Sequence, residues 1–128
     1  MNNKVSIIVP CYNSELTIKK CAQSILNNII TTDNPELFEF IIVNDGSNDG
    51  TADIIKNIDN AKIINHGKNQ GLSAARNSGI KESNSDYIIF IDSDIILSNN
   101  WVKRIYSKIQ EKKEVVGIIG NLEPEPNK

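Results

Sequence analysis

The chain has 128 residues and a formal net charge of −2, with 39% hydrophobic and 23% charged residues. This size and composition suit one domain with a hydrophobic core and exclude a disordered polypeptide. The slightly acidic balance argues against nucleic-acid binding through a broad basic surface. No apolar run reaches the length of a membrane span, and no signal-peptide pattern precedes the first run.

Short apolar runs typical of strands alternate with segments of helical spacing. In chain order, the sequence predicts a strand at 5–9, a helix at 14–29, a strand at 38–43, a helix at 51–58, a strand at 62–65, a helix at 72–81, a strand at 87–91, a helix at 101–109 and a strand at 115–119. Asn13 or Ser14 is expected to cap the first helix. The alternation predicts an α/β fold, a mainly parallel open sheet flanked by helices on both faces. We expect one domain over 1–122, followed by a polar tail over 123–128.

Cysteine and histidine are scarce in this chain. Cys11, Cys21 and His66 form no CxxC pair or Cys/His cluster, which excludes a structural zinc site. Cys21 falls on the apolar side of a predicted helix and is interpreted as a core residue. His66 is interpreted as a loop residue, because no Ser or Cys nucleophile in a recognisable elbow accompanies it. A reducing, cytoplasmic compartment fits this cysteine usage.

The most distinctive polar segments follow the ends of the first four predicted strands. They are 11–13, 44–51, 67–71 and 92–94. In an open parallel sheet the carboxyl ends of the strands line the ligand crevice. Each segment taken singly also fits an ordinary turn, but the recurrence of carboxylates at these positions favours a ligand site.

The segment Asp92-Ser93-Asp94 follows directly on a β-rich apolar run. Two carboxylates two residues apart at a strand end can point the same way, and a hard divalent cation would relieve their repulsion. Mg²⁺ or Mn²⁺ takes one or two protein carboxylates and completes its shell with phosphate oxygens and water. The alternative is a turn with a helix cap, since Asp and Ser favour such positions.

Three further residues have both a binding and a structural interpretation. An ionised Asp45 only accepts hydrogen bonds, so it suits a base edge with an N–H, or it caps the turn beside its glycines. Tyr12 can lay its ring on a planar base or sit partly buried at the sheet rim. Arg76 can hold phosphate through paired donors or extend into solvent. No GxGxxG or GxxxxGK[ST] motif accompanies them.

The segments 5–13, 41–51, 69–79 and 92–94 together resemble, in this order, family 2 glycosyltransferases with the GT-A fold. The match covers most of residues 5–120, with Asn44 where the family often has another Asp. The resemblance implies a Rossmann-like half that binds a nucleotide diphosphate sugar, usually a uridine diphosphate (UDP) sugar. It also implies inverting transfer of the sugar to an acceptor hydroxyl, on a sugar or a lipid-linked sugar.

The resemblance assigns roles to the matching positions. For the base and nucleoside, it implies that Pro10 and Tyr12 hold the base, that Asp45 accepts a hydrogen bond from the base N–H, and that Glu15 reaches the nucleoside. For the rest of the donor, it implies that Arg76 lies near the nucleotide and that Asp92 lies near the ribose or a metal-bound water. Asp94 would ligate the metal. That metal, Mn²⁺ or Mg²⁺, would bridge the diphosphate and neutralise charge on the leaving group.

An inverting transfer also needs a general base, which in the family lies beyond the position where this chain stops. We therefore expect no catalytic base within the 128 residues; Glu123 and Glu125 match no such motif. Two hypotheses remain: a part of an active metal-dependent transferase, or a donor-binding module that is inactive until another segment or an oligomeric partner completes it. The family suggests a protein that is cytoplasmic or peripheral to the inner face of the membrane. A receiver-like signalling domain is disfavoured, because Gly120 and Asn121 stand where it would have a Lys.

Overall fold

The computed structural model of the chain describes residues 3–111. Its elements in chain order are β1 (Val5–Cys11), α1 (Ile18–Ile30), a 3-10 turn (Pro35–Leu37), β2 (Phe38–Asn44), α2 (Thr51–Ile55), β3 (Lys62–Asn65), α3 (Leu72–Glu82), β4 (Tyr87–Phe90) and α4 (Trp101–Glu111). The predicted strand at 115–119, the tail at 123–128 and the boundary at 122 lie outside the described residues.

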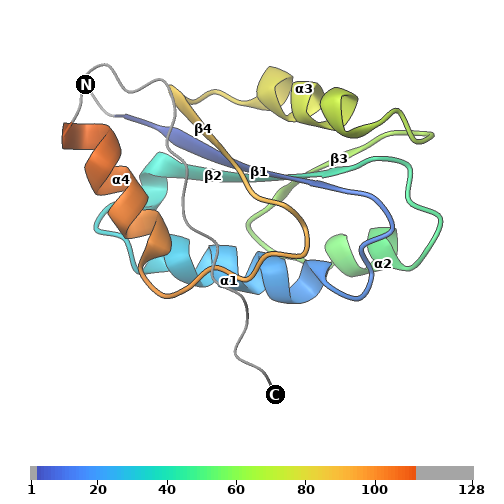
Figure 1. The fold of residues 1–128 in the computed structure, drawn as a ribbon, viewed down its shortest axis with the longest axis horizontal. Coiled ribbons are helices and arrows are strands. Elements are labelled where there is room, and N and C mark those ends of the chain that lie inside the picture. Colours follow the sequence, from blue (N-terminus) through green and yellow to red (C-terminus); the bar gives the residue numbers. More distant parts are fainter. Residues whose placement is uncertain (1–2, 112–128) are drawn as a thin grey trace.

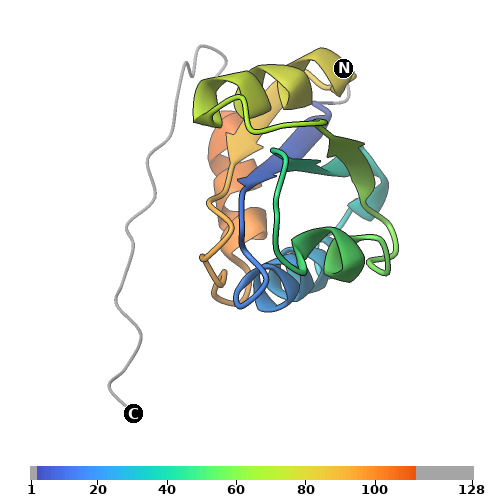
Figure 2. The ribbon, with the colours of Figure 1, turned by 90° about the vertical axis from the view of Figure 1, so that its right-hand side faces the viewer.

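The four strands form one parallel sheet in the order β3-β2-β1-β4. Helix α3 covers one face of this sheet, while α1, α2 and α4 lie on the other (Figures 1 and 2). Parallel strands joined through helices put apolar residues on both faces of the central strands, and β1 is accordingly buried along its whole length. The predicted α/β architecture is therefore confirmed.

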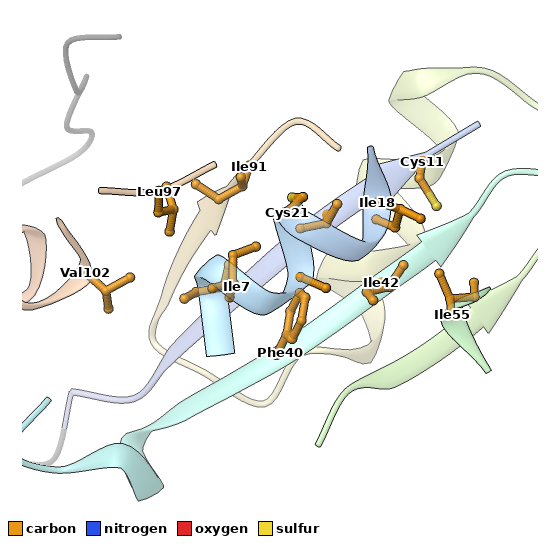
Figure 3. Close-up of a cluster of buried hydrophobic side chains, with 13 residues drawn as sticks. Ile7, Cys11, Ile18, Cys21, Phe40, Ile42, Ile55, Ile91, Leu97 and Val102 are labelled. Carbon is orange, nitrogen blue, oxygen red and sulfur yellow. The ribbon is translucent and has the colours of Figure 1, made fainter. Parts of the chain in front are cut away.

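Two apolar layers sandwich the sheet. The larger lies under α1, α2 and α4 and includes Ile7, Ile18 and Ile42 (Figure 3). The smaller joins α3 to the sheet through Ile8, Ile41, Val43 and Ala75. The close approach of α3 depends on small residues, because a Cβ at Gly79 would lie 2.5 Å from Cγ2 of Ile8. This packing fixes where the polar ends of the strands emerge.

Pro10 lies near the end of the central strand β1 and is buried. The main-chain oxygen of Ile8 accepts from the Ile91 N–H on the β4 side, and the main-chain oxygen of Cys11 accepts from the Asp45 N–H on the β2 side. Because the main-chain groups of successive residues point to alternate sides of a strand, the backbone nitrogen of Pro10 faces β4. The pairing of β1 with β4 has already ended there, since its last pair is Ile8 with Phe90. The missing N–H of Pro10 therefore removes no ladder hydrogen bond.

Several predicted boundaries were wrong, most of all the start of helix α1. Helix α1 begins at Ile18, and neither Asn13 nor Ser14 caps it, because Asn13 Oδ1 accepts from the Asn48 N–H and Ser14 Oγ bonds Tyr12 O and Ser93 Oγ. The residues before the helix are thus tied to neighbouring loops. Helix α2 ends at residue 55 instead of 58, strand β1 ends at residue 11 instead of 9, and helix α4 continues to residue 111 instead of 109. The ends of α1, β2, α3 and β4 differ from the predicted ones by one residue each.

Candidate functional site

The loops after β1 and β2 are joined by reciprocal hydrogen bonds at the carboxyl edge of the sheet. The Asn13 N–H donates to Ser47 Oγ over 2.9 Å, and Asn13 Oδ1 accepts from the Asn48 N–H over 2.8 Å. One residue on, the Ser14 N–H donates to Thr51 Oγ1 over 2.8 Å. Side chains of each loop satisfy backbone groups of the other, so the two loops hold each other in place.

Glu15 and Asp49 complete this junction. Glu15 Oε2 accepts from the Gly50 N–H over 2.8 Å, while Asp49 Oδ2 accepts from the Glu15 N–H over 3.2 Å. Asp49 Oδ1 also accepts from both the N–H and the hydroxyl of Thr51. Desolvation raises the pKa of Asp49, but the bonds from Thr51 and Glu15 outweigh it, so the pKa lies below its ordinary value. Glu15, predicted to reach the nucleoside, thus has one oxygen engaged within the chain.

Asp45 is buried directly after β2, with 4% of its side chain exposed. Its Oδ1 accepts from the Gln70 N–H over 2.9 Å and lies 2.7 Å from Nδ1 of His66. Its Oδ2 accepts from the Gly71 N–H over 2.9 Å and from Asn69 Nδ2 over 3.1 Å. These four partners use about all the lone-pair positions of a carboxylate.

The environment of Asp45 keeps its carboxylate ionised. Burial acts to raise its pKa, but the hydrogen bonds from His66 and from the backbone N–H groups of Gln70 and Gly71 outweigh that effect, so the pKa lies below its ordinary value. Gly71 immediately precedes α3, so the carboxylate also lies at the positive end of that helix. Asp45 therefore fastens the 67–71 loop and the start of α3 to the end of β2.

His66 is the residue that sequence reasoning missed. It follows β3 in a loop, as predicted, but its side chain is only 9% exposed. Besides its contact with Asp45, its ring places Nε2 2.7 Å from Ser78 Oγ on α3. The register of β2 and β3 explains the contact: Asn44 pairs with Asn65, so the residues that follow them, Asp45 and His66, lie side by side at the sheet edge.

Asp92 and Asp94 have a different environment. Both are exposed, and among residues 3–111 neither carboxylate has a hydrogen-bond or ion-pair partner. They lie in a turn closed by the Ile95 N–H on Asp92 O over 3.1 Å, so strand alternation, the reason given from the sequence, does not orient them. The turn is fastened by Ser93 Oγ, 2.8 Å from Ser14 Oγ, and by Cys21 Sγ, which donates to Asp92 O over 3.6 Å.

This turn fits a hard divalent cation on chemical grounds. Two ionisable carboxylates are exposed and have no partner in the part of the chain that the structure describes, while the serine between them anchors the backbone. Oxygen donors of this kind suit Mg²⁺ and Mn²⁺, which keep other positions for phosphate and water. Within residues 3–111, no group of three or more His, Cys, Asp or Glu side chains is arranged around a common metal position.

Arg76 lies on α3 on the side of the sheet where β4 ends. Its guanidinium carbon is 5.5 Å from the ring centroid of Phe90, which is 39% exposed, an arrangement typical of a cation–π contact. Its Nε is buried without a hydrogen-bond partner among the described residues. Phe90 stands two residues before Asp92, so the cation and the open carboxylates belong to the same side of the edge.

The remaining predicted residues flank this edge. Tyr12 is 45% exposed, whereas Pro10 is buried in β1. Cys11 and Cys21 are buried free thiols. Desolvation raises the pKa of each to about 12, and nearby carboxylates add to this effect, chiefly Asp49 for Cys11 and Asp94 for Cys21. Both thiols therefore stay protonated and serve as core residues rather than nucleophiles.

One hollow of the surface lies away from these residues. A shallow cavity of about 720 Å³ opens at the opposite edge of the sheet, lined by Lys4 of the N-terminal segment, Phe38 at the start of β2 and Ile30 at the end of α1. It shares none of the polar residues described at the carboxyl edge, so we locate the candidate site by its polar groups rather than by cavity size.

Among the helices of residues 3–111, none has both the length and the apolar composition of a membrane-spanning segment.

The model of the family "Glycosyl transferase family 2" matches residues 6–126. Glycosyltransferase GlyG of Streptococcus pneumoniae is 35% identical over 125 residues, which are 94% of this chain and 40% of that protein. Poly(ribitol-phosphate) beta-glucosyltransferase of Bacillus spizizenii is 34% identical over 115 residues, 86% of this chain and 18% of that protein.

Among solved structures, S. aureus TarS 1-349 in complex with UDP-GlcNAc superposes with a TM-score of 0.74 and 29% identity, over 95% of this chain and 37% of that one. The same TarS fragment in complex with UDP gives a TM-score of 0.75 and 28% identity, over 95% of this chain and 38% of that one. The chain thus spans less than half the length of each of these relatives.

Proposed function

Because the chain belongs to glycosyl transferase family 2, we propose that it forms the donor-binding part of an enzyme that transfers a sugar from a UDP-sugar to an acceptor hydroxyl. The observation that carries this proposal is the exposed pair Asp92 and Asp94 at the carboxyl edge of a parallel sheet, whose carboxylates have no partner among residues 3–111. That edge is where open α/β sheets bind ligands. The UDP and UDP-GlcNAc complexes of TarS support a nucleotide-sugar ligand.

Asp94, with Asp92 beside it, would hold Mn²⁺ or Mg²⁺ together with the diphosphate. The cation, when bound, supplies positive charge against the negative charge that develops on the leaving diphosphate. The chain's own contribution is to hold the two carboxylates in a turn fixed by Ser93 and Cys21. Arg76 would add a second positive charge near the nucleotide, from the α3 side.

The base would lie across the loops after β1 and β2. The ring of the exposed Tyr12 offers a surface for stacking, with Pro10 fixing the strand behind it. Asp45 would accept from the base N–H in exchange for the amide of Asn69. That exposed side chain makes the longest bonds to Asp45, 3.1 Å to Oδ2 and 3.3 Å to the main-chain oxygen.

A second candidate function is donor binding without transfer by these 128 residues alone. An inverting transfer needs a carboxylate free to deprotonate the acceptor. At the described edge, Asp45, Asp49 and Glu15 each accept hydrogen bonds from the chain, and the open pair is assigned to the cation. A general base would then come from another segment or partner, as would contacts to the acceptor.

Calorimetric titration of UDP into the 128-residue chain, with and without Mn²⁺, tests the donor site. We expect binding that requires Mn²⁺ and weakens at least about tenfold in Asp94→Ala. Asp53→Ala is the matched control, because the side chain of this exposed aspartate on α2 pairs, among the described residues, only with Lys56. Binding that ignores both the metal and the Asp94 substitution would overturn the assignment. Turnover of a UDP-sugar onto a sugar acceptor by this chain alone would overturn the second candidate function.

A further inference from the structure

Helix α3 contacts the sheet along one line of residues and has a different neighbour on each side of that line. Ala75 and Gly79 are buried against the sheet and form the line of closest approach. Successive helical residues turn by about 100°, so Arg76 and Ser78 project to opposite sides of this line. Their contacts agree: Ser78 meets His66 after β3, and Arg76 meets Phe90 of β4. These two contacts restrain rotation of α3 about its axis from opposite sides, and on the β3 side the ion pair of Lys62 with Glu82, 3.3 Å from Nζ to Oε2, acts with the His66 contact.

The two contacts differ in rigidity. A cation over an aromatic ring tolerates many orientations, whereas His66 is held between two partners at 2.7 Å each. Because an ionised carboxylate only accepts, Nδ1 of His66 donates to Asp45, and in the neutral ring Nε2 accepts from the Ser78 hydroxyl. The His66 N–H also donates to Asn44 O over 2.9 Å. His66 thus links the ends of β2 and β3 to the middle of α3.

We propose that His66 is a positioning residue of the donor site, because the Asp45–His66–Ser78 chain of hydrogen bonds sets the rotation of α3 and thereby holds the Arg76 guanidinium beside the end of β4. This inference rests on the proposed function, in which Arg76 contacts the nucleotide. His66 itself touches no reacting group. Its contribution reaches the ligand through Ser78 and the helix.

Two substitutions of His66 separate its two side-chain contacts. His66→Asn keeps a donor at the position of Nδ1, toward Asp45, and loses the contact with Ser78. His66→Gln keeps an acceptor at the position of Nε2, toward Ser78, and loses the donor to Asp45. Ser78→Ala removes the α3 contact from the other side while preserving helix propensity. Ser107→Ala is the matched control, since Ser107 is an exposed serine within α4.

Titration of UDP in the presence of Mn²⁺ measures the effect. We expect binding to weaken about 3- to 10-fold in His66→Asn, His66→Gln and Ser78→Ala, because each substitution breaks one hydrogen bond of the Asp45–His66–Ser78 chain, and to remain near wild type in Ser107→Ala. In an Arg76→Ala background, His66→Asn should produce no further loss, because the residue through which it acts is gone. A purely structural role would instead weaken both backgrounds by the same factor.

The outcomes separate this inference from the proposed function. Wild-type chain that fails to bind UDP with Mn²⁺ overturns the donor site and this inference together. Wild-type chain that binds, with His66→Asn and Ser78→Ala binding equally well, overturns the positioning role alone. Thermal unfolding of each variant accompanies the titration. If His66→Asn unfolds, the comparison of Ser78→Ala with Ser107→Ala decides the question.

Discussion

Asp45 and the pair Asp92 and Asp94 stand at the carboxyl ends of strands of one sheet, yet they have opposite surroundings. Asp45 is buried and meets four hydrogen-bonding partners from the chain. Asp92 and Asp94 are exposed, and within residues 3–111 their carboxylates meet none. Position at a strand end therefore does not decide what an aspartate does.

The difference lies in which acceptor positions the chain itself fills. A carboxylate saturated by internal donors stabilises the fold, and a ligand must displace one of those donors to reach it. An open carboxylate contributes little to folding and remains free for a cation. By this criterion, Asp45 belongs first to the framework of the site, and Asp94 belongs to the ligand. Substitutions that change one kind of carboxylate at a time test this division.

Asp45→Asn is expected to give the largest effect on folding. The amide keeps the shape, but its NH₂ group would face at least one donor from Gln70, Gly71 or Asn69. Leaving such buried groups unpaired should lower the free energy of unfolding by about 3 kcal/mol. Urea denaturation measures the change, and Asp53→Asn, at an exposed position of α2, should shift the free energy of unfolding by less than about 0.5 kcal/mol. Equal shifts in the two variants would contradict the framework role.

Gly46→Ala should follow in size. Gly46 has φ of +70°, and an added Cβ would collide with the backbone of Lys68 and Asn69 in the loop that Asp45 holds. Left-handed backbone and backbone collision together should destabilise the chain by about 2 kcal/mol. Gly67→Ala, in the 67–71 loop itself, provides the control, because no atom of the described residues beyond its chain neighbours lies within 4 Å of its added Cβ. A free energy of unfolding that is the same in both variants would show that the loop can move away from Gly46.

Acidification should weaken the fold through the filled carboxylates. The folded-state pKa values of Asp45 and Asp49 lie below the ordinary value of 3.8. Their stabilising contribution is therefore complete above pH 3.8 and is lost as pH falls through the lower, folded-state values. Urea midpoints measured from pH 7 down to pH 2 should fall below pH 3.8 for wild type and fall less for Asp45→Asn. Parallel curves for the two proteins would exclude Asp45 as a source of the acid sensitivity.

The layers and the site edge were predictable from the sequence because they depend on period and chain order. The apolar runs ending at Val9 and Val43 predicted buried strands, and alternation with helices predicted their parallel arrangement. The polar groups that follow were therefore expected at one edge. Their division into filled and open carboxylates was not, because it depends on donors up to 26 residues away in sequence, such as the Gly71 N–H on Asp45.

The start of α1 and the partners of His66 were missed for the same reason. Ser14 is a good helix cap by residue type, but its N–H and hydroxyl are bonded to Thr51 and Ser93. His66 has no local motif, and its importance arises only when β2 and β3 are in register. Local rules describe a residue's options, while contacts between loops select among them.

The smallest effect on folding is expected where the effect on binding is large. Asp92→Asn and Asp94→Asn remove charge from exposed positions without internal partners among the described residues, so the free energy of unfolding should change by less than about 0.5 kcal/mol. Any change should be stabilising, because each substitution removes the repulsion between the two carboxylates. Added Mn²⁺ with UDP should raise the unfolding temperature of wild type but not of Asp94→Asn. Thermal unfolding with and without these ligands measures both effects. Marked destabilisation of Asp94→Asn in the absence of ligand would place Asp94 in the framework with Asp45, and the contrast between the two regions would no longer hold.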